Sequence, residues 1–373
     1  MKTATEILSD LISIRTDSTK QTNDEIVCYI TSILKENDIL FELVPVGNLN
    51  NIVAGINIPS LKSVDKGIVL SGHMDTVDAV IENWQTNPFQ ATIKDGKIFG
   101  RGAMDMKHFI AVALSLLPKL KELSIPVFLA FSCDEETDVL GVQKIINFFS
   151  KNDIHPQYAL VGEATDFKLA VGNRGYAGYK TSVQGVAGHA GSPQLGTNAI
   201  YIASKIISKI EELNQKYFKQ GATLNVGQVK GGVGRNSVPA TASFDWEVRF
   251  KKDSDKIEVL QELDGFCQKL KADYPKANIL NEPKETLLAF EEKEESFITK
   301  VADGILKTEK IYCPYASEAG FFQAFGIDTL MCGAGDFKLA HTSNEYVLVS
   351  DVEQYRMFLL TLLNQMNDVS SKS

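Results

Sequence analysis

Short segments of continuously apolar residues alternate with helical patterns through the first part of the chain, and this alternation restricts the possible folds more than any other feature. The apolar segments are NIVAGI (51–56), GIVLSG (67–72), PVFLAFSC (126–133) and YALVGE (158–163). Apolar residues recur at helical spacing in 22–37 and 107–120. Strands that are apolar on both faces are typical of a parallel sheet covered by helices. We therefore predict an α/β fold with a mostly parallel sheet and helices on both faces.

The middle of the chain follows a different pattern. From about Arg174, apolar and polar residues alternate in YKTSVQG (179–185) and ASFDWEVRF (242–250), which predicts strands with one face in water. The chain of 373 residues also exceeds the length of about 250–300 residues at which single cores usually stop growing. We predict a small α+β domain at residues 174–282, inserted into a larger domain formed by residues 1–173 and 283–373.

Charge and composition argue against several classes of partner. The net charge of −9 does not favour binding to nucleic acid or to an acidic membrane surface. No uninterrupted apolar stretch has the length of a membrane span, and the first residues, MKTATEILSDLISIRT, show no apolar secretory core. The five cysteines are scattered, as is usual for reduced thiols. We expect a cytoplasmic protein that acts on a small molecule.

Polar residues follow the predicted strands of the larger domain, at the points where the strands end. His73 and Asp75 come after the apolar run at 67–70 and, being two residues apart, share one face of a strand. The carboxyl ends of parallel strands meet at one edge of a sheet, and ligands bind there. The residues expected to converge at this edge are His73, Asp75, Asp105, Glu135, Glu136, Glu163 and His341.

Singly, each of these residues has an ordinary structural interpretation, because an aspartate or histidine after a strand is usually a cap or a turn residue. Together, the five carboxylates would repel one another, raise one another's pKa and cost stability. Two divalent cations would supply four positive charges against them. A mixed set of histidine and carboxylate ligands suits zinc or a similar first-row ion better than calcium.

Five segments, in this order and spacing, resemble motifs of the M20 family of di-metal amidohydrolases: SGHMDTVDA, GRGAMDMKHFIA, DEET, GEATD and AHTSNEYV. The resemblance covers nearly the whole chain, including the predicted insertion. It implies a zinc-peptidase-like catalytic domain, an inserted ferredoxin-like domain that serves as a lid and in dimerisation, and a homodimer. The chain departs from the family at Ala164, where proline often follows the glutamate.

The resemblance also implies roles for the residues at the sheet edge. His73, Asp105 and Glu163 would bind one metal ion, and Asp105, Glu136 and His341 the other, so that Asp105 bridges two Zn²⁺ ions, for which Co²⁺ may substitute. Asp75 would orient the imidazole of His73. Glu135 would be the general base that activates a metal-bridged water to hydroxide.

Four further residues have both a functional and a structural interpretation. His189 in the insertion resembles the family histidine that reaches across the dimer to an oxyanion, and is otherwise a loop histidine. Asn236 and Arg249 resemble binders of the substrate carboxylate, although Arg249 is nearly as well explained as a paired surface arginine. Glu318 would meet a substrate ammonium group, or else is a surface glutamate.

The segment 315–347 resembles the branch of the family that cleaves N²-acetylornithine to ornithine and acetate, a step of arginine biosynthesis. This substrate is the one expected, and N-acetylcitrulline and N-acetyl-lysine remain open. Succinyl-diaminopimelate desuccinylase, carboxypeptidase and aminoacylase activities are the alternatives within the family. A non-catalytic, metal-stabilised binding protein is the alternative of another class, and such a protein would be expected to have lost Glu135 or a metal ligand.

Overall fold

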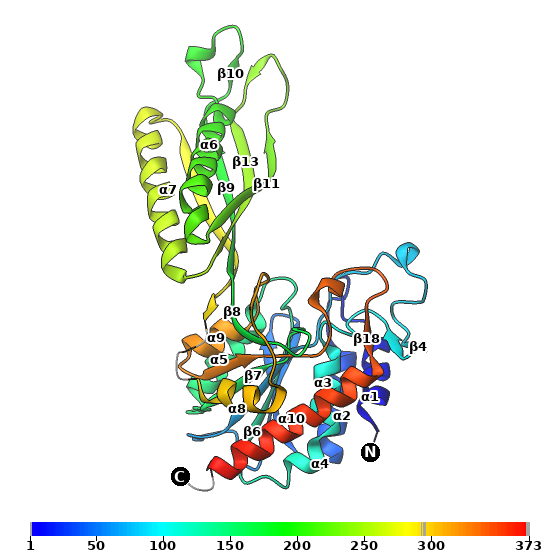
Figure 1. Ribbon diagram of the computed structural model, residues 1–373. Coiled ribbons are helices and arrows are strands. Elements are labelled where there is room, and N and C mark those ends of the chain that lie inside the picture. The colour runs from blue at the N-terminus through cyan, green and yellow to red at the C-terminus, as the bar shows by residue number, and fades with distance from the viewer. Residues whose placement is uncertain (1, 292, 294–295, 371–373) are drawn as a thin grey trace. The chain divides into compact units, whose positions relative to one another are not determined.

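The computed structural model describes residues 2–291, 293 and 296–370, and the chain divides into two compact units. Unit 1 contains Met1–Gly172, Glu291–Cys313 and Ser317–Ser373, and unit 2 contains Asn173–Phe290 and Pro314–Ala316 (Figure 1). Among the described residues, no helix is both long and apolar enough to cross a membrane.

Unit 1 is built on a nine-stranded sheet whose centre is parallel. The neighbours β6, β3, β7 and β17 run parallel to one another, whereas the flanking strands β1, β2 and β8 pair antiparallel. The strands on this path are β1 (Leu40–Val46), β2 (Leu49–Ile56), β6 (Val127–Ser132), β3 (Ile68–His73), β7 (Tyr158–Val161), β17 (Asp328–Met331), β8 (Leu169–Asn173) and β15 (Phe290–Glu291), and β16 (Lys310–Cys313) pairs with β8. The predicted parallel sheet is therefore confirmed at the centre.

Helices cover both faces of this sheet, as predicted. Leu70 and Leu129 point to one face, into a core shared with α1, α2, α3 and α10. Phe128, the neighbour of Leu129, points to the other face and packs on Phe149 of α5, with ring centroids 5.7 Å apart. The helices of unit 1 are α1 (Ala4–Ser13), α2 (Asp24–Glu36), α3 (Lys107–Ser115), α4 (Leu117–Leu120), α5 (Leu140–Lys151), α8 (Phe297–Leu306), α9 (Ala319–Ala324) and α10 (Val349–Ser370).

Unit 1 also contains a separate three-stranded sheet, and one of its strands leads into the loop before α3. It has the order β18 (Tyr346–Leu348), β5 (Lys97–Phe99), β4 (Thr92–Lys94), and all its pairings are antiparallel. Because β5 ends at Phe99 and α3 begins at Lys107, the segment 100–106 between them is anchored at both ends.

Unit 2 is a four-stranded antiparallel sheet with two helices, in the chain order βαββαβ of a ferredoxin-like unit. The sheet order is β11 (Thr223–Gly231), β13 (Thr241–Phe250), β9 (Gly175–Gln184), β14 (Asn278–Leu287). The helices α6 (Ala199–Tyr217) and α7 (Asp253–Asp273) pack on one face through a core that includes Ile206, Trp246 and Val259. The two-stranded pair β10 (Gly188–His189) and β12 (Ser237–Val238) lies outside this sheet.

The second predicted domain boundary, between residues 282 and 283, differs by several residues from the division into compact units. It falls inside β14, whose pairing with β9 continues to Leu287 opposite Tyr176. The ladder of hydrogen bonds keeps β14 in the sheet of unit 2, which extends to Phe290. The first boundary, at residue 173, differs from the structure by one residue.

Candidate metal centre

The polar residues at the carboxyl edge of the parallel strands come together in unit 1. His73 is the last residue of β3, Glu135 and Glu136 follow β6, and Glu163 follows β7. Two further residues come from loops, Asp105 from the segment before α3 and His341 from the turn after Phe337–Leu339. The residues that end or follow β3, β6 and β7 have fixed positions because each of these strands is hydrogen-bonded to a neighbour on both sides.

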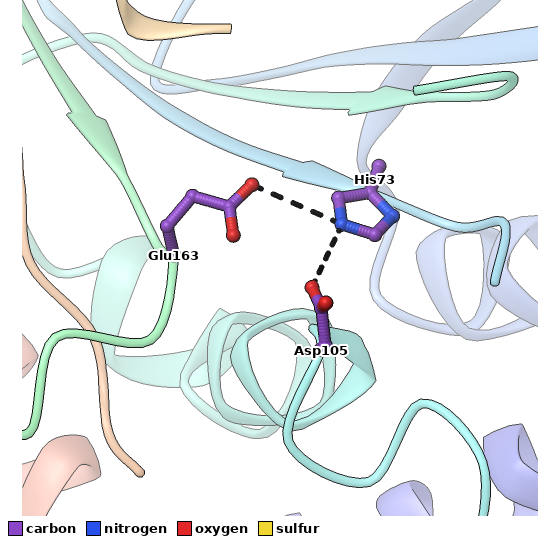
Figure 2. Close-up of side chains that lie close together, drawn as sticks. All are labelled: His73, Asp105 and Glu163. Atoms are coloured by element: carbon purple, nitrogen blue, oxygen red, sulfur yellow. Dashed lines mark hydrogen bonds and ion pairs between the residues drawn. The ribbon is translucent and has the colours of Figure 1, made fainter. Parts of the chain in front are cut away.

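His73, Asp105 and Glu163 form one group of metal-ligand type (Figure 2). The Nε2 atom of His73 lies 3.2 Å from Oδ1 of Asp105 and 3.8 Å from Oε1 of Glu163. One ligand atom of each residue lies within 4.8 Å of the others. Their side chains converge on one point from a strand end, a helix start and a second strand end, as Figure 2 shows.

Asp105, Glu136 and His341 form a second group with the same mutual spacing. The Nε2 atom of His341 lies 3.0 Å from the Glu136 carboxylate and 3.4 Å from Oδ2 of Asp105. Asp105 thus presents Oδ1 to the first group and Oδ2 to the second. This arrangement suits a carboxylate that bridges two cations. Glu135 lies with His73 and Glu136 in a third such group, so it stands beside both.

Asp75 holds His73 and the loop after β6 in place. Its backbone carbonyl oxygen lies 3.0 Å from Nδ1 of His73, and its carboxylate oxygen Oδ1 lies 3.6 Å from the same atom. The other carboxylate oxygen accepts a hydrogen bond of 2.9 Å from the backbone N–H of Glu136. A proton on Nδ1 that is donated to the carbonyl leaves Nε2 free to act as a ligand.

The electrostatics of the cluster show how strongly its carboxylates interact. Burial, with the nearby Asp105, raises the pKa of Glu163 to about 8. Burial also raises the pKa of Glu135 well above its usual range, with Glu136 and Glu163 adding to the shift. Hydrogen bonds to Asp105 and Glu136 raise the pKa of His341 to about 10. The group therefore favours bound positive charge.

The residues present fit a pair of divalent cations on these grounds. Two imidazoles and three carboxylates supply nitrogen and oxygen ligands in two overlapping groups, a set that zinc and similar first-row ions accept. Cations would offset the mutual repulsion that raises the pKa of Glu135 and Glu163.

The predicted residues of unit 2 fall at two separate places. His189 and Asn236 lie together, because the backbone N–H of Ala190 donates to the carbonyl of Asn236 and His189 pairs with Ser237. Arg249 lies near the other end of β13, where it donates to Glu247 at 2.9 Å and stands over the Tyr176 ring. The eight residue-to-residue steps from 241 to 249 along this strand span about 27 Å. Asn236 and Arg249 therefore lie at separate places in unit 2, and their roles in binding a carboxylate stay predictions.

Glu318 is buried, so it is not the surface glutamate of the structural interpretation, and its contact with a substrate ammonium group stays a prediction. Glu318 is 1% exposed, and its carboxylate accepts a hydrogen bond of 3.2 Å from the Ser71 hydroxyl. Burial raises its pKa to about 7. The residue begins α9, which packs between β17 and α5, so its side chain points into unit 1 and away from solvent.

Two buried charged residues beside the centre are not singled out by the sequence patterns. Arg101 is 4% exposed and Glu345 is fully buried, and they form an ion pair of 2.7 Å. Both lie in segments that resemble family motifs, GRGAMDMK and AHTSNEYV. Arg101 lies in the segment that carries Asp105, and Glu345 lies in the segment that carries His341. The opposite charges of these two residues are the signal from which their pairing could have been inferred.

The chain matches the sequence model of peptidase family M20/M25/M40 over residues 69–365. Similar sequences include proteins named acetylornithine deacetylase. The one from Buchnera aphidicola subsp. Schizaphis graminum is 27% identical over 376 residues, which cover 96% of each chain. The one from Aliivibrio fischeri is 28% identical over 308 residues, which cover 79% of this chain and 80% of that protein.

Solved structures share the fold at lower sequence identity. A tripeptidase from Staphylococcus aureus is 19% identical and covers 98% of both chains with a TM-score of 0.79. An M20 family metallo-carboxypeptidase from Sulfolobus solfataricus is 20% identical, with a TM-score of 0.74 over 97% of this chain and 99% of that one.

Binding of Zn²⁺ to the metal-free protein near pH 7 should release protons. The pKa of His341 is about 10 and that of Glu163 about 8, so both hold a proton at that pH and must lose it to become ligands. Affinity for Zn²⁺ should therefore rise with pH across the neutral range. Calorimetric titration in buffers of different ionisation enthalpy measures the number of protons released, and His341→Ala should reduce it by about one. Binding without proton release would contradict this electrostatic picture.

Proposed function

The chain belongs to peptidase family M20/M25/M40, and on this premise we propose that it is a di-zinc hydrolase that cleaves the amide bond of an N-acylated amino acid. The observation that carries the proposal is the pair of ligand groups that share Asp105, with Glu135 beside them. Ligands alone would serve a binding protein as well. The adjacent glutamate that is not needed as a ligand favours catalysis.

In this proposal His73, Asp105 and Glu163 hold one cation and Asp105, Glu136 and His341 the other. Two divalent cations, when bound, would polarise the carbonyl of the amide and acidify a water molecule. Glu135 accepts the proton as the water oxygen adds to the carbonyl carbon, and returns it to the nitrogen as the carbon–nitrogen bond breaks. A carboxylate whose pKa is raised by burial is suited to both steps near neutral pH.

The substrate proposed is N²-acetylornithine, with ornithine and acetate as products. The support is the name shared by similar sequences, one of which matches over 96% of each chain. A contact between Glu318, which is buried against Ser71, and the ammonium group of ornithine stays a prediction.

We expect the wild-type protein with Zn²⁺ or Co²⁺ to release amine faster from N²-acetylornithine than from N-succinyl-diaminopimelate, N-acetylmethionine or a Gly-Glu dipeptide.

Glu135→Gln should keep two metals per chain and lose hydrolysis of every substrate by about 10²–10⁴-fold, because the proton acceptor is removed while the ligands remain. Amine release and metal content are the measurements.

Three outcomes of this panel would count against parts of the proposal. If amine were released fastest from the succinyl substrate or the dipeptide, that class of compound would replace N²-acetylornithine as the proposed substrate. A Glu135→Gln protein with an empty metal position would make Glu135 a ligand. No hydrolysis of any substrate by metal-loaded wild type would favour the binding-protein alternative.

His189 has the geometry of a hydrogen-bond donor toward an oxyanion. Its Nδ1 accepts a hydrogen bond of 3.0 Å from the backbone N–H of Gly191, so in the neutral imidazole the proton resides on Nε2. The ring is exposed at the β10–β12 pair, where Nε2–H can donate to a partner. In the proposal this partner is the developing oxyanion at the metal centre of a second chain.

A homodimer is proposed because unit 2 offers an edge that can pair. The strand β11 lies at one end of the four-stranded sheet, and edge strands pair readily with another chain. Exposed apolar side chains accompany it, with Tyr201 on α6 66% exposed and Val229 on β11 59% exposed. An isologous pairing of two such units would bury both patches.

Mixing two inactive variants tests whether the site is shared. A dimer of one His189→Ala chain and one Glu135→Gln chain has one site with both substitutions and one with neither. After subunit exchange, activity should return to about a quarter of wild type when half the dimers are mixed. Absence of recovery despite demonstrated exchange would place His189 within its own chain's site or outside catalysis.

A further inference from the structure

The segment 100–106, which brings Asp105 to the metal centre, is gathered around a single buried carboxylate. The Oε1 atom of Glu345 accepts hydrogen bonds from the backbone N–H groups of Met104 (2.9 Å) and Asp105 (3.1 Å). The Oε2 atom accepts from the backbone N–H of Gly102 at 3.2 Å. Glu345 has no exposed surface. Three N–H groups of one short loop therefore converge on one side chain.

This convergence depends on the backbone conformation of the loop. Gly102 has a φ of +79°, and a Cβ atom built there would lie 2.7 Å from the Thr76 side chain. Successive N–H groups of such a loop form a concavity that favours an anion. Here the anion is supplied by the chain itself, from a residue 240 positions beyond Asp105.

The charge of Glu345 is balanced within the same site. Nη1 of Arg101 donates to Oε2 at 2.7 Å, and the guanidinium lies over the Trp84 ring at 5.3 Å and donates to the carbonyl of Asp78. Because a buried carboxylate is costly without a partner, the ion pair with Arg101 offsets part of the cost of burying Glu345 in the loop.

Glu345 also connects the two loops that carry metal ligands. It follows His341 by four residues and directly precedes β18. Its own carbonyl accepts a hydrogen bond of 3.1 Å from the N–H of Gly100, which extends the β18–β5 pairing by one step. The backbone of this residue thus holds the start of the Asp105 loop, and its side chain holds the end.

We propose that Glu345, paired with Arg101, is a positioning residue that sets the metal affinity of the centre by fixing the backbone of Asp105. It acts through the bridging carboxylate and touches neither substrate nor, in this structure, a ligand atom. The inference rests on the proposed function in one respect, that Asp105 is a metal ligand. It does not depend on which amide is cleaved.

Glu345→Gln should weaken Zn²⁺ binding by about 10–100-fold, the range found when partners that orient metal ligands are changed. The amide keeps the size of the side chain but places an NH₂ group against N–H donors, so at least one of the loop's hydrogen bonds is lost. Competition with a chromophoric chelator measures the affinity. The visible absorption of the Co²⁺ form should change as well, because the ligand geometry at Asp105 changes.

Asp328→Asn is the matched control. Asp328 also caps backbone N–H groups with a carboxylate, accepting from Phe297 at 2.7 Å and Ile298 at 3.3 Å. It lies at the amino end of β17, opposite Tyr158, the first residue of β7, and therefore at the edge of the sheet away from the metal centre. The control should lower thermal stability without changing Zn²⁺ affinity or the Co²⁺ spectrum.

A second variant keeps the proposal testable if Glu345→Gln does not fold. Glu345→Asp retains the charge and the pairing with Arg101 but draws the carboxylate back from the loop, and should show an intermediate loss of affinity. Unchanged Zn²⁺ affinity in a folded variant, or an equal loss in Asp328→Asn, would overturn the inference. Wild-type protein that binds two Zn²⁺ but hydrolyses none of the substrate panel would instead contradict the proposed function and leave this inference standing.

Discussion

Several carboxylates meet at the carboxyl edge of the parallel sheet and repel one another. The surrounding residues of unit 1 must offset this repulsion for the fold to be stable. Burial and neighbouring acids raise the pKa of Glu135 and Glu163, so the cluster is unfavourable as a set of bare charges. The fold opposes the repulsion with imidazoles on either side of Asp105 and a backbone N–H that donates to Asp75. Divalent cations would complete this balance, and Glu135, which stands beside both ligand groups, favours hydrolysis over binding alone.

The local parts of this arrangement could be predicted from the sequence, because they depend on short patterns. Apolar runs identify β3, β6 and β7, and parallel strands place His73, Glu135 and Glu163 at one edge whatever the details of packing. Contacts between distant segments leave no such pattern. Neither the burial of Glu318 against Ser71 nor the hydrogen bonds from the Asp105 loop to Glu345 could be predicted, since no spacing or periodicity shows which buried side chain meets which distant segment.

Unit 2 shows the same limit in another form. Its strands can be predicted from the alternation of apolar and polar residues. Motif resemblance alone, however, groups Asn236 with Arg249 as binders of the substrate carboxylate. The antiparallel pairing instead places Asn236 beside His189 and leaves Arg249 near the residues at which the chain enters β9, opposite Tyr176. Two separate sets of polar residues in unit 2 agree with the proposal that the first set serves a second chain.

The most direct test of the account is an anomalous diffraction measurement at the zinc absorption edge on crystals of the Zn²⁺-loaded protein. Two anomalous peaks about 3.5–4 Å apart are expected, one on each side of the Asp105 carboxylate. The first should lie next to His73 and Glu163, and the second next to Glu136 and His341. A single peak, or two peaks that do not share Asp105, would contradict the claim that these residues form a dinuclear centre.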